Sequence, residues 1–336
     1  MKAIVCENPF ELRIVDRPIP EVGPGEVLIR VHRVGLCGTD YHIFSGRHPF
    51  LTYPRVIGHE LAGEVVTAPK GSRFEQGQLV AINPYVSCGT CIACRKGKPN
   101  ACANVQVLGV HVDGGMCELL AVPERAVLDA TGLTLDQAAM LEFLAVGAHA
   151  VARSALAAGD RVLVVGAGPI GIATGLFARS EGAAVTLVDR RSTRLAYAQN
   201  RLGFDDVLLA GPDLIDALSS RTNGEMFDVV FEATGSIQSM SQSLSYVAPG
   251  GTMVLVGVAP GELSFSDPEF HKRETTLLAS RNALPRDFER VIAAVKAGII
   301  PTAALQTHSF PAAEMPQRLP ELIADADHVL KAIACF

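Results

Sequence analysis

Four cysteines of the 336-residue chain fall within fifteen positions, at the spacing C-x2-C-x2-C-x7-C. They are Cys88, Cys91, Cys94 and Cys102. The intervening residues are rich in turn formers, so the four thiolates can converge on one zinc ion at about 2.3 Å. A site with four protein ligands has no open position and is structural. An iron–sulfur cluster, disulfides or free thiols are the alternatives, because they too are compatible with clustered cysteines.

A second group of possible ligands is split between two short segments. The first is C-G-T-D-Y-H at 37–42, and the second is G-H-E at 58–60. A single cysteine is usually a small buried hydrophobe, and a single histidine is usually a core or surface residue with its hydrogen bonds satisfied. It is the combination of Cys37, Asp40, His42, His59 and Glu60 that suggests a second metal site.

A glycine motif, Gly166-Ala-Gly168-Pro169-Ile170-Gly171, follows a candidate strand and opens a helical pattern over 170–180. The first two glycines allow a tight turn and close approach of the backbone to a pyrophosphate, and the third lets the helix pack on the strand. The free N–H groups at the helix N-terminus attract phosphate. The motif therefore predicts a dinucleotide site.

Asp189 ends the next candidate strand, 23 residues after Gly166. An acid about 20 residues beyond the first glycine binds the 2′-hydroxyl of the adenosine ribose, and its charge would repel a 2′-phosphate. This favours NAD over NADP. Arg190 and Arg191 follow closely and keep NADP open, since either arginine can pair with that phosphate. Arg194 is a further candidate for cofactor binding.

The elements that must position these residues differ along the chain. Residues 1–140 are rich in turns and short alternating runs that predict β-structure. From 144 to 280 apolar strands alternate with helical patterns. The expected strands are 161–166, 184–189, 206–209, 227–232, 251–257 and 274–279. Six such strands joined by helices suit a doubly wound parallel sheet. A helix at 287–297 and a strand at 329–334 are expected to pack back onto the first domain.

Composition excludes several classes of protein. The net charge is −6, with no basic tract, so neither nucleic acid nor a membrane surface is an expected partner. No apolar run reaches the roughly 20 residues of a membrane span, and the N-terminus lacks the apolar core of a signal peptide. We expect a cytoplasmic protein with reduced thiols and a small-molecule ligand.

The whole chain resembles the zinc-dependent medium-chain dehydrogenase/reductase family, in its polyol, threonine and sugar-acid dehydrogenase branch. Six segments carry the resemblance: G-L-C-G-T-D-Y-H at 35–42, P-R-V-I-G-H-E-L-A-G-E-V at 54–65, the cysteines of 88–102, D-G-G-M-C-E-L-L-A-V-P at 113–123, L-E-F-L-A-V-G-A-H-A at 141–150 and V-V-G-A-G-P-I-G at 164–171.

The resemblance implies an α/β protein with two domains. Residues 1–143 and 280–336 would form a GroES-like, zinc-binding catalytic domain, and 144–279 an NAD-binding Rossmann domain with a six-stranded sheet. The family also implies self-association to a dimer or tetramer, and two zinc ions per chain, one catalytic and one structural.

In such a family Cys37 and His59 would bind the catalytic zinc, with Glu142 as a third ligand and Glu60 beside the metal, able to exchange onto it. An open zinc site lowers the pKa of a bound alcohol. Two further roles follow by resemblance for the residues that accompany these ligands. Thr39 would contact the substrate oxygen and pass its proton, through the cofactor ribose, to His42, while Asp40 would orient His59.

The implied reaction is reversible, NAD-dependent oxidation of a secondary alcohol of a polyol or sugar acid to the ketone. Phe143 stands where the family commonly has proline. This difference affects the local backbone and therefore the direction in which the Glu142 side chain points. Arg281-Asn282 stands where polyol enzymes often have Arg-Tyr, and Arg281 could pair with a substrate carboxylate, which favours sugar acids of the galactonate or gulonate type. A simple-alcohol or threonine dehydrogenase, a metal-free reductase, and a noncatalytic NAD-binding regulatory or structural protein are the alternatives.

Overall fold

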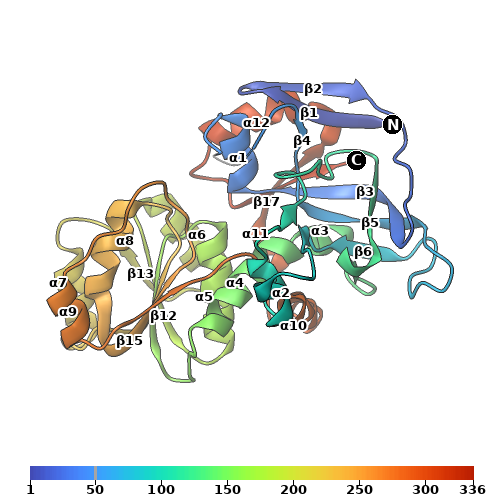
Figure 1. Ribbon diagram of the computed structural model, residues 1–336. Helices are drawn as coiled ribbons and strands as arrows, with labels where there is room; N and C mark the ends of the chain where they lie inside the picture. The colour runs from blue at the N-terminus through green and yellow to red at the C-terminus, as the bar shows by residue number, and fades with distance from the viewer. Residues whose placement is uncertain (49–50) are drawn as a thin grey trace. The chain divides into compact units, whose positions relative to one another are not determined.

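The computed structural model describes residues 1–48 and 51–336. The chain divides into two compact units (Figure 1). The first comprises Met1–Phe143 and Leu284–Phe336, and the second Leu144–Ala283. The division after Ala283 lies four residues beyond the position expected from the sequence, because Ser280 to Ala283 follow the last strand of the second unit.

The first unit contains two larger sheets, in which most strand pairs are antiparallel, and the two-stranded sheet of β7, Tyr85–Val86, and β8, Gln106–Val107. A three-stranded sheet has the order β2-β1-β4, and a seven-stranded sheet has the order β10-β6-β5-β3-β18-β17, with β9 also paired to β3. Their bounds are β1 Lys2–Asn8, β2 Glu11–Asp16, β3 Glu26–Leu36, β4 Arg55–Val56, β5 Glu60–Thr67, β6 Leu79–Ile82, β9 Leu119–Pro123, β10 Val127–Asp129, β17 Gln306–Pro311 and β18 Lys331–Cys335. The C-terminal strand thus lies inside the first unit.

Strand β3 is the centre of this sheet and supplies much of its core. Val27, Ile29 and Val31 lie on one face of the strand and are at most 1% exposed, and Leu28, on the other face, is 8% exposed. The first part of β3 is therefore buried on both faces. β3 pairs with β5, β9 and β18, so residues distant in sequence meet at its C-terminal end, directly before Cys37.

Short helices fill the turns of the first unit. They are α1 Gly38–Phe44, α2 Ile92–Arg95, α3 Leu135–Ala139, α10 Pro285–Lys296, α11 Thr302–Leu305 and α12 Met315–Ala324. Helix α3 begins with a capping box, in which Thr134 Oγ1 accepts from Gln137 N at 3.2 Å and Gln137 Oε1 accepts from Thr134 N at 2.9 Å. Helix α4, Leu141–Arg153, carries the chain from the first unit into the second.

The second unit is a six-stranded parallel sheet of order β13-β12-β11-β14-β15-β16. The strands are β11 Arg161–Val165, β12 Ala184–Asp189, β13 Asp206–Leu209, β14 Phe227–Glu232, β15 Val247–Leu255 and β16 Thr276–Ala279. Its helices are α5 Pro169–Ser180, α6 Ser192–Leu202, α7 Leu214–Arg221, α8 Ile237–Ser243 and α9 Asp267–Lys272, and they cover both faces (Figure 1). This is the doubly wound order, so the predicted fold class is confirmed.

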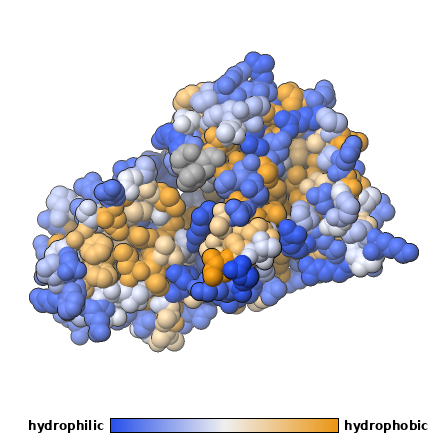
Figure 2. Space-filling view, viewed as in Figure 1, coloured by the Kyte–Doolittle hydropathy of each residue, from blue (hydrophilic) through white to orange (hydrophobic). Residues whose placement is uncertain are grey.

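The central strands β11 and β14 of the second unit are mainly apolar and buried because both faces of the sheet are covered there, whereas the edge strands β13 and β16 are partly exposed. Val162, Leu163 and Val164 of β11 are fully buried. Figure 2 shows hydrophilic residues around the rims of both units and patches of hydrophobic residues on the second. Among the described residues, no helix is long and apolar enough to cross a membrane.

Candidate metal centres and dinucleotide site

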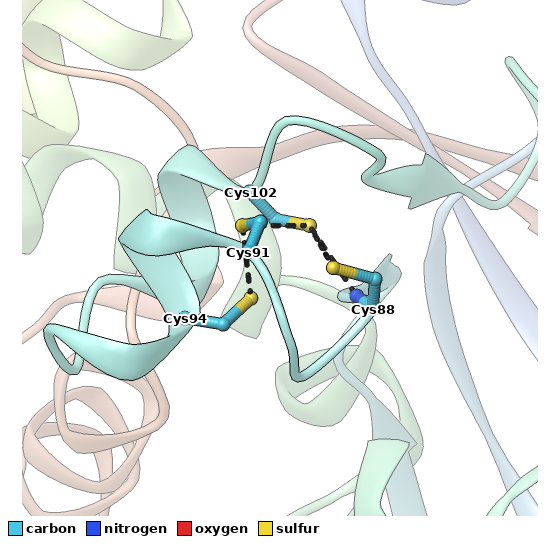
Figure 3. A group of neighbouring side chains, drawn as sticks. All are labelled: Cys88, Cys91, Cys94 and Cys102. Carbon is cyan, nitrogen blue, oxygen red and sulfur yellow. Dashed lines mark hydrogen bonds between the residues drawn. The ribbon is translucent and has the colours of Figure 1, made fainter.

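The four cysteines at 88–102 converge as their spacing predicts (Figure 3). Neighbouring Sγ atoms are 3.5 Å apart for Cys91 and Cys94, 3.8 Å for Cys91 and Cys102, and 3.4 Å for Cys102 and Cys88. A disulfide needs about 2.05 Å, so these thiols are not bonded to one another. Four sulfurs around a zinc ion at about 2.3 Å would lie roughly 3.8 Å apart, which is close to these separations.

Local backbone geometry favours thiolates in this loop. Backbone N–H groups of Thr90 and Cys91 lower the pKa of Cys88 to about 5. Backbone hydrogen bonds likewise lower the pKa of Cys91. Burial, and then its sulfur neighbours, raises the pKa of Cys94 to about 11. A thiolate at Cys94 is therefore favoured only with a cation among the sulfurs, and the four-sulfur donor set fits zinc.

A second group is formed by Cys37, His59 and Glu60, whose ligand atoms all lie within 4.8 Å of one another. Cys37 links β3 to α1, and His59 and Glu60 stand at the start of β5. The two segments meet because β3 and β5 pair, with Gly35 opposite Glu60. Thiol, imidazole and carboxylate are the ligand types that zinc prefers, so this group also fits the ion.

Asp40 is fully buried behind this group. Its Oδ2 accepts from Cys37 N at 2.9 Å and its Oδ1 from Gly58 N at 3.2 Å, so it joins the two ligand-bearing segments. Asp40 Oδ1 lies 3.9 Å from His59 Nδ1. Within residues 1–48 and 51–336 that nitrogen has no hydrogen-bond partner. The Asp40 carboxylate therefore hydrogen-bonds to both ligand-bearing segments, and it lies near the imidazole ring without a hydrogen bond to it.

The surroundings of His59 favour positive charge. Burial lowers the pKa of His59, but Asp40 and then Cys37 outweigh that effect, so the pKa rises well above the ordinary value. The same acidic neighbours would stabilise a divalent cation. This supports the fit of zinc independently of the spacing of the ligands.

Glu142 approaches this group from α4 without joining the three ligand atoms that lie within 4.8 Å. It is 5% exposed and accepts a hydrogen bond from the Tyr85 hydroxyl. Its charge raises the pKa values of both His59 and Glu60. Glu60, in contrast, is held by the ammonium group of Lys331.

Sequence reasoning missed Tyr85 and Lys331. A signal for Lys331 existed, because it is the one charged residue in the apolar run V-L-K-A-I-A at 329–334. A buried lysine almost always has a partner. The sequence offers no comparable signal for Tyr85, whose partner depends on the tertiary fold.

Helix α1 carries the two residues expected to move a proton. Thr39 Oγ1 lies 3.8 Å from Cys37 Sγ. His42 follows three positions later, so both side chains lie on one side of the helix. Burial and then Arg47 lower the pKa of His42, which leaves its imidazole neutral near neutral pH.

The glycine motif forms a tight turn between β11 and α5. Gly166 has φ of 107°, a conformation that L side chains rarely adopt, and Gly168 is the N-cap of α5. A Cβ at Gly171 would lie 1.7 Å from the carbonyl oxygen of Gly166. Pro169 and Ile170 begin the helix, whose N-terminal N–H groups are the ones expected to meet phosphate.

Backbone hydrogen bonds hold the Asp189 carboxylate at this turn. Its Oδ2 accepts from Ala167 N at 2.7 Å and its Oδ1 accepts from Arg191 N at 2.8 Å. Arg190 is exposed, and a guanidinium nitrogen of Arg194 lies 3.4 Å from the position of a Cβ at Gly168. The structure thus brings the acid and one arginine to the glycine turn.

Arg281 and Asn282 follow β16 and belong to the second unit. Arg281 is exposed, and Asn282 has φ of 54°. The metal-ligand residues belong to the first unit, so the structure does not by itself group Arg281 or Asn282 with them.

Comparison with known proteins identifies both halves of the chain. Residues 23–132 match the alcohol dehydrogenase GroES-like domain, and residues 169–297 match the zinc-binding dehydrogenase family. The chain is 40% identical over 337 residues to L-galactonate-5-dehydrogenase of Escherichia coli K12, covering 100% of this chain and 99% of that protein.

Two solved structures are also similar. An E. coli CFT073 alcohol dehydrogenase, rspB, complexed with NADH has a TM-score of 0.94 and 30% identity, covering 100% of this chain and 99% of that one. A putative zinc-binding dehydrogenase of Sinorhizobium meliloti bound to NADP has a TM-score of 0.91 and 30% identity, again covering 100% and 99%. Of these two similar structures, one is thus complexed with NADH and the other bound to NADP.

Proposed function

The chain belongs to the zinc-dependent medium-chain alcohol dehydrogenase family, and we propose that it catalyses the reversible, NAD-dependent oxidation of a secondary alcohol of a sugar acid to the ketone. Polyols are the neighbouring substrate class. The observation that carries the proposal is the group of Cys37, His59 and Glu60, because it pairs a thiol, an imidazole and a carboxylate in a dehydrogenase fold.

The proposed catalytic metal ligands are Cys37 and His59, with Glu142 and Glu60 as the two carboxylates that compete for the third position. The proposed structural metal is held by Cys88, Cys91, Cys94 and Cys102. When bound, the catalytic zinc would polarise the substrate hydroxyl and NAD would accept the hydride. Two zinc ions per chain are therefore expected.

This chain's own residues would handle the proton. Thr39 Oγ1, close to the Cys37 sulfur, would accept the hydrogen bond of the substrate hydroxyl. His42 would take up the released proton on its ring, because its lowered pKa keeps it unprotonated and ready to accept. Asp40 would keep the His59 ring in position from behind.

NAD is preferred over NADP in this proposal because of Asp189. Its carboxylate is fixed beside the glycine turn by two backbone N–H groups and presents negative charge where a 2′-phosphate would sit. Arg190 and Arg194 act in the opposite direction. A titration with both coenzymes decides between them, with tighter binding of NADH expected.

The sugar-acid assignment rests on the likeness to a galactonate dehydrogenase and on Arg281, which would pair with the substrate carboxylate, with Asn282 beside it.

Four reduced cysteines in one site support a cytoplasmic location. Self-association to a dimer or tetramer is part of the same proposal and can be measured by light scattering.

The decisive experiment is NADH formation with a panel of aldonates and polyols, before and after treatment with a chelator. Turnover of an aldonate that is lost on metal removal and restored by zinc supports the proposal. A Cys37→Ala variant is the matched control, because it should lose turnover while keeping the metal of the cysteine loop. Full zinc occupancy without turnover of any substrate would favour a noncatalytic NAD-binding protein.

A further inference from the structure

Lys331 is a lysine buried in the interior of the first unit, on strand β18. Its side chain is 1% exposed, and its Nζ lies 2.6 Å from each carboxylate oxygen of Glu60 and 3.0 Å from the carbonyl oxygen of Leu36. An ammonium group has three N–H donors, so these contacts use all of them. The Phe143 ring, 4.3 Å from Nζ, covers a further side.

Stability alone does not explain this pair. Taking two charges out of water costs about as much as their attraction returns, and apolar residues of similar size often do as well or better. Glu60 is fully buried, yet it also belongs to the group of metal-ligand residues. The pair is therefore better explained by what Lys331 does to Glu60.

Three adjacent strands build the pair around Gly35. In the sheet, Gly35 of β3 stands opposite Glu60 on one side and opposite Ile333 of β18 on the other. A Cβ at Gly35 would lie 2.2 Å from Glu60 Oε2. The absence of a side chain at Gly35 is what lets the Glu60 carboxylate turn toward Lys331.

Charge explains why a counter-ion is needed at this place. A Cys37 thiolate together with the carboxylates of Asp40, Glu60 and Glu142 would carry up to four negative charges, more than one zinc ion neutralises. Lys331 supplies a positive charge directly against Glu60. It engages both oxygens of Glu60, whereas Glu142 accepts a hydrogen bond from the neutral Tyr85 hydroxyl.

We propose that Lys331 is a positioning residue that holds Glu60 by both carboxylate oxygens, limits its bonding to the catalytic zinc and thereby keeps a coordination position available to substrate. The proposal rests on the proposed function, because it assumes a zinc ion at Cys37 and His59. Lys331 and the metal compete for the same two oxygens, and substrate binding would favour the Lys331-bound arrangement.

The test compares Lys331→Met, Glu60→Gln and the double variant, using the zinc- and cobalt-loaded proteins. The first measurement is the rate at which a chelator removes the catalytic metal. The second is the visible absorption of the cobalt form, which reports the number of ligands. Lys331→Met should slow metal release by about tenfold and shift the cobalt spectrum toward a higher coordination number. In the Glu60→Gln background the same change should alter neither.

Equal effects of Lys331→Met in both backgrounds, or no effect in either, would overturn the proposal. Gly35→Ala is a second route, because its methyl group displaces Glu60 from an intact Lys331 and should act in the same direction. If the Lys331→Met protein does not fold because Glu60 is left buried without a partner, the Gly35→Ala protein still tests the proposal. Lys2→Met, at an exposed ion pair, is the matched control. None of these measurements needs a substrate, so they stand even if the wild-type protein turns nothing over.

Discussion

Tyr85 ties Glu142, a carboxylate proposed as a zinc ligand, to the rest of the first unit. Its hydroxyl donates to Glu142, and its ring lies 6.3 Å from that of Phe288. Tyr85→Phe keeps the ring packing but leaves a buried carboxylate short of one donor, and a hydrogen bond to a charged group contributes about 1.5–3 kcal/mol. We expect kcat/KM to fall by at least about tenfold, with the fold intact by circular dichroism.

The matched control is Tyr41→Phe. The Tyr41 hydroxyl is buried and has no hydrogen-bond partner among the residues that the structure describes, so its removal should leave kcat/KM nearly unchanged. A Tyr85→Phe enzyme as active as the Tyr41→Phe enzyme would show that Tyr85 does not position Glu142.

The pKa of His42 predicts how kcat/KM changes at acidic pH. Burial, followed by repulsion from Arg47, lowers the pKa of His42 below its ordinary value of 6.5. A general base works only when unprotonated, so kcat/KM for alcohol oxidation should rise with pH through an inflection below 6.5. Arg47→Ala removes one cause of the shift and should move that inflection upward.

The measurement is kcat/KM against pH for the wild type, Arg47→Ala and the distant Arg13→Ala as control. In His42→Asn the inflection should vanish and the rate should fall by about 10²-fold or more. An inflection that persists in His42→Asn would assign the proton to another group.

Much of the proposed site is visible in the sequence at the scale of single residues, but only where ligands stand in short motifs. Cys37 with Asp40, and His59 with Glu60, are local patterns, and the β3–β5 pairing joins them. Lys331 lies 271 residues from Glu60, and Tyr85 lies 57 residues from Glu142. Contacts at such separations have no local pattern, so periodicity and motif spacing do not find them.

The cysteine loop is the element whose order depends most on a metal. Between β7, Tyr85–Val86, and β8, Gln106–Val107, it holds only the four-residue helix α2 and one 3₁₀ turn, and α2 buries none of its residues. A segment without a core of its own needs another source of stability. Cys94→Ser should therefore lose one zinc per chain, lower the apparent Tm by about 5 °C and expose the loop to proteolysis.

We would check this prediction by zinc content from mass spectrometry, thermal unfolding and limited trypsin digestion. Trypsin is suitable because Arg95, Lys96 and Lys98 offer cleavage sites in the loop. Cys335→Ser is the control, because Cys335 belongs to neither metal group and contacts only Ser309 among the interactions described for its sulfur. Retention of both zinc ions in Cys94→Ser would mean that three thiolates suffice.

Elements of the second unit were the easiest to predict. Its six strands are mainly apolar runs that alternate with helical patterns, and each expected strand overlaps an observed one. The first unit contains two-residue strands such as β4 and β7, and short helices such as α1. These are fixed by pairing and by caps, and segments so brief show no periodicity.

At the scale of the whole molecule, the two units differ in which parts of the chain form them. The second unit is one continuous segment, whereas the first combines an N-terminal and a C-terminal segment, which meet where β18 pairs with β3. Leu36 and Lys331, in hydrogen-bond contact there, are 295 residues apart. Contacts of such separation form late, because loop closure must precede them. The group of Cys37, His59 and Glu60 therefore depends on a long-range event, because Glu60 pairs with Lys331, while the glycine turn does not.

This difference predicts that residues 144–283 fold and bind cofactor alone. The glycine motif, Asp189 and the whole six-stranded sheet lie within that segment, and its ends fall at the boundaries of the second unit. The fragment should show cooperative urea unfolding and bind NADH within about tenfold of the full chain, measured by fluorescence titration. Gly171→Ala in the fragment should abolish binding, because the added methyl group would clash with the Gly166 carbonyl, whereas Gly211→Ala, with no atom within 4 Å of the added Cβ, should not. A folded fragment that fails to bind NADH would show that the first unit supplies part of the cofactor's binding energy.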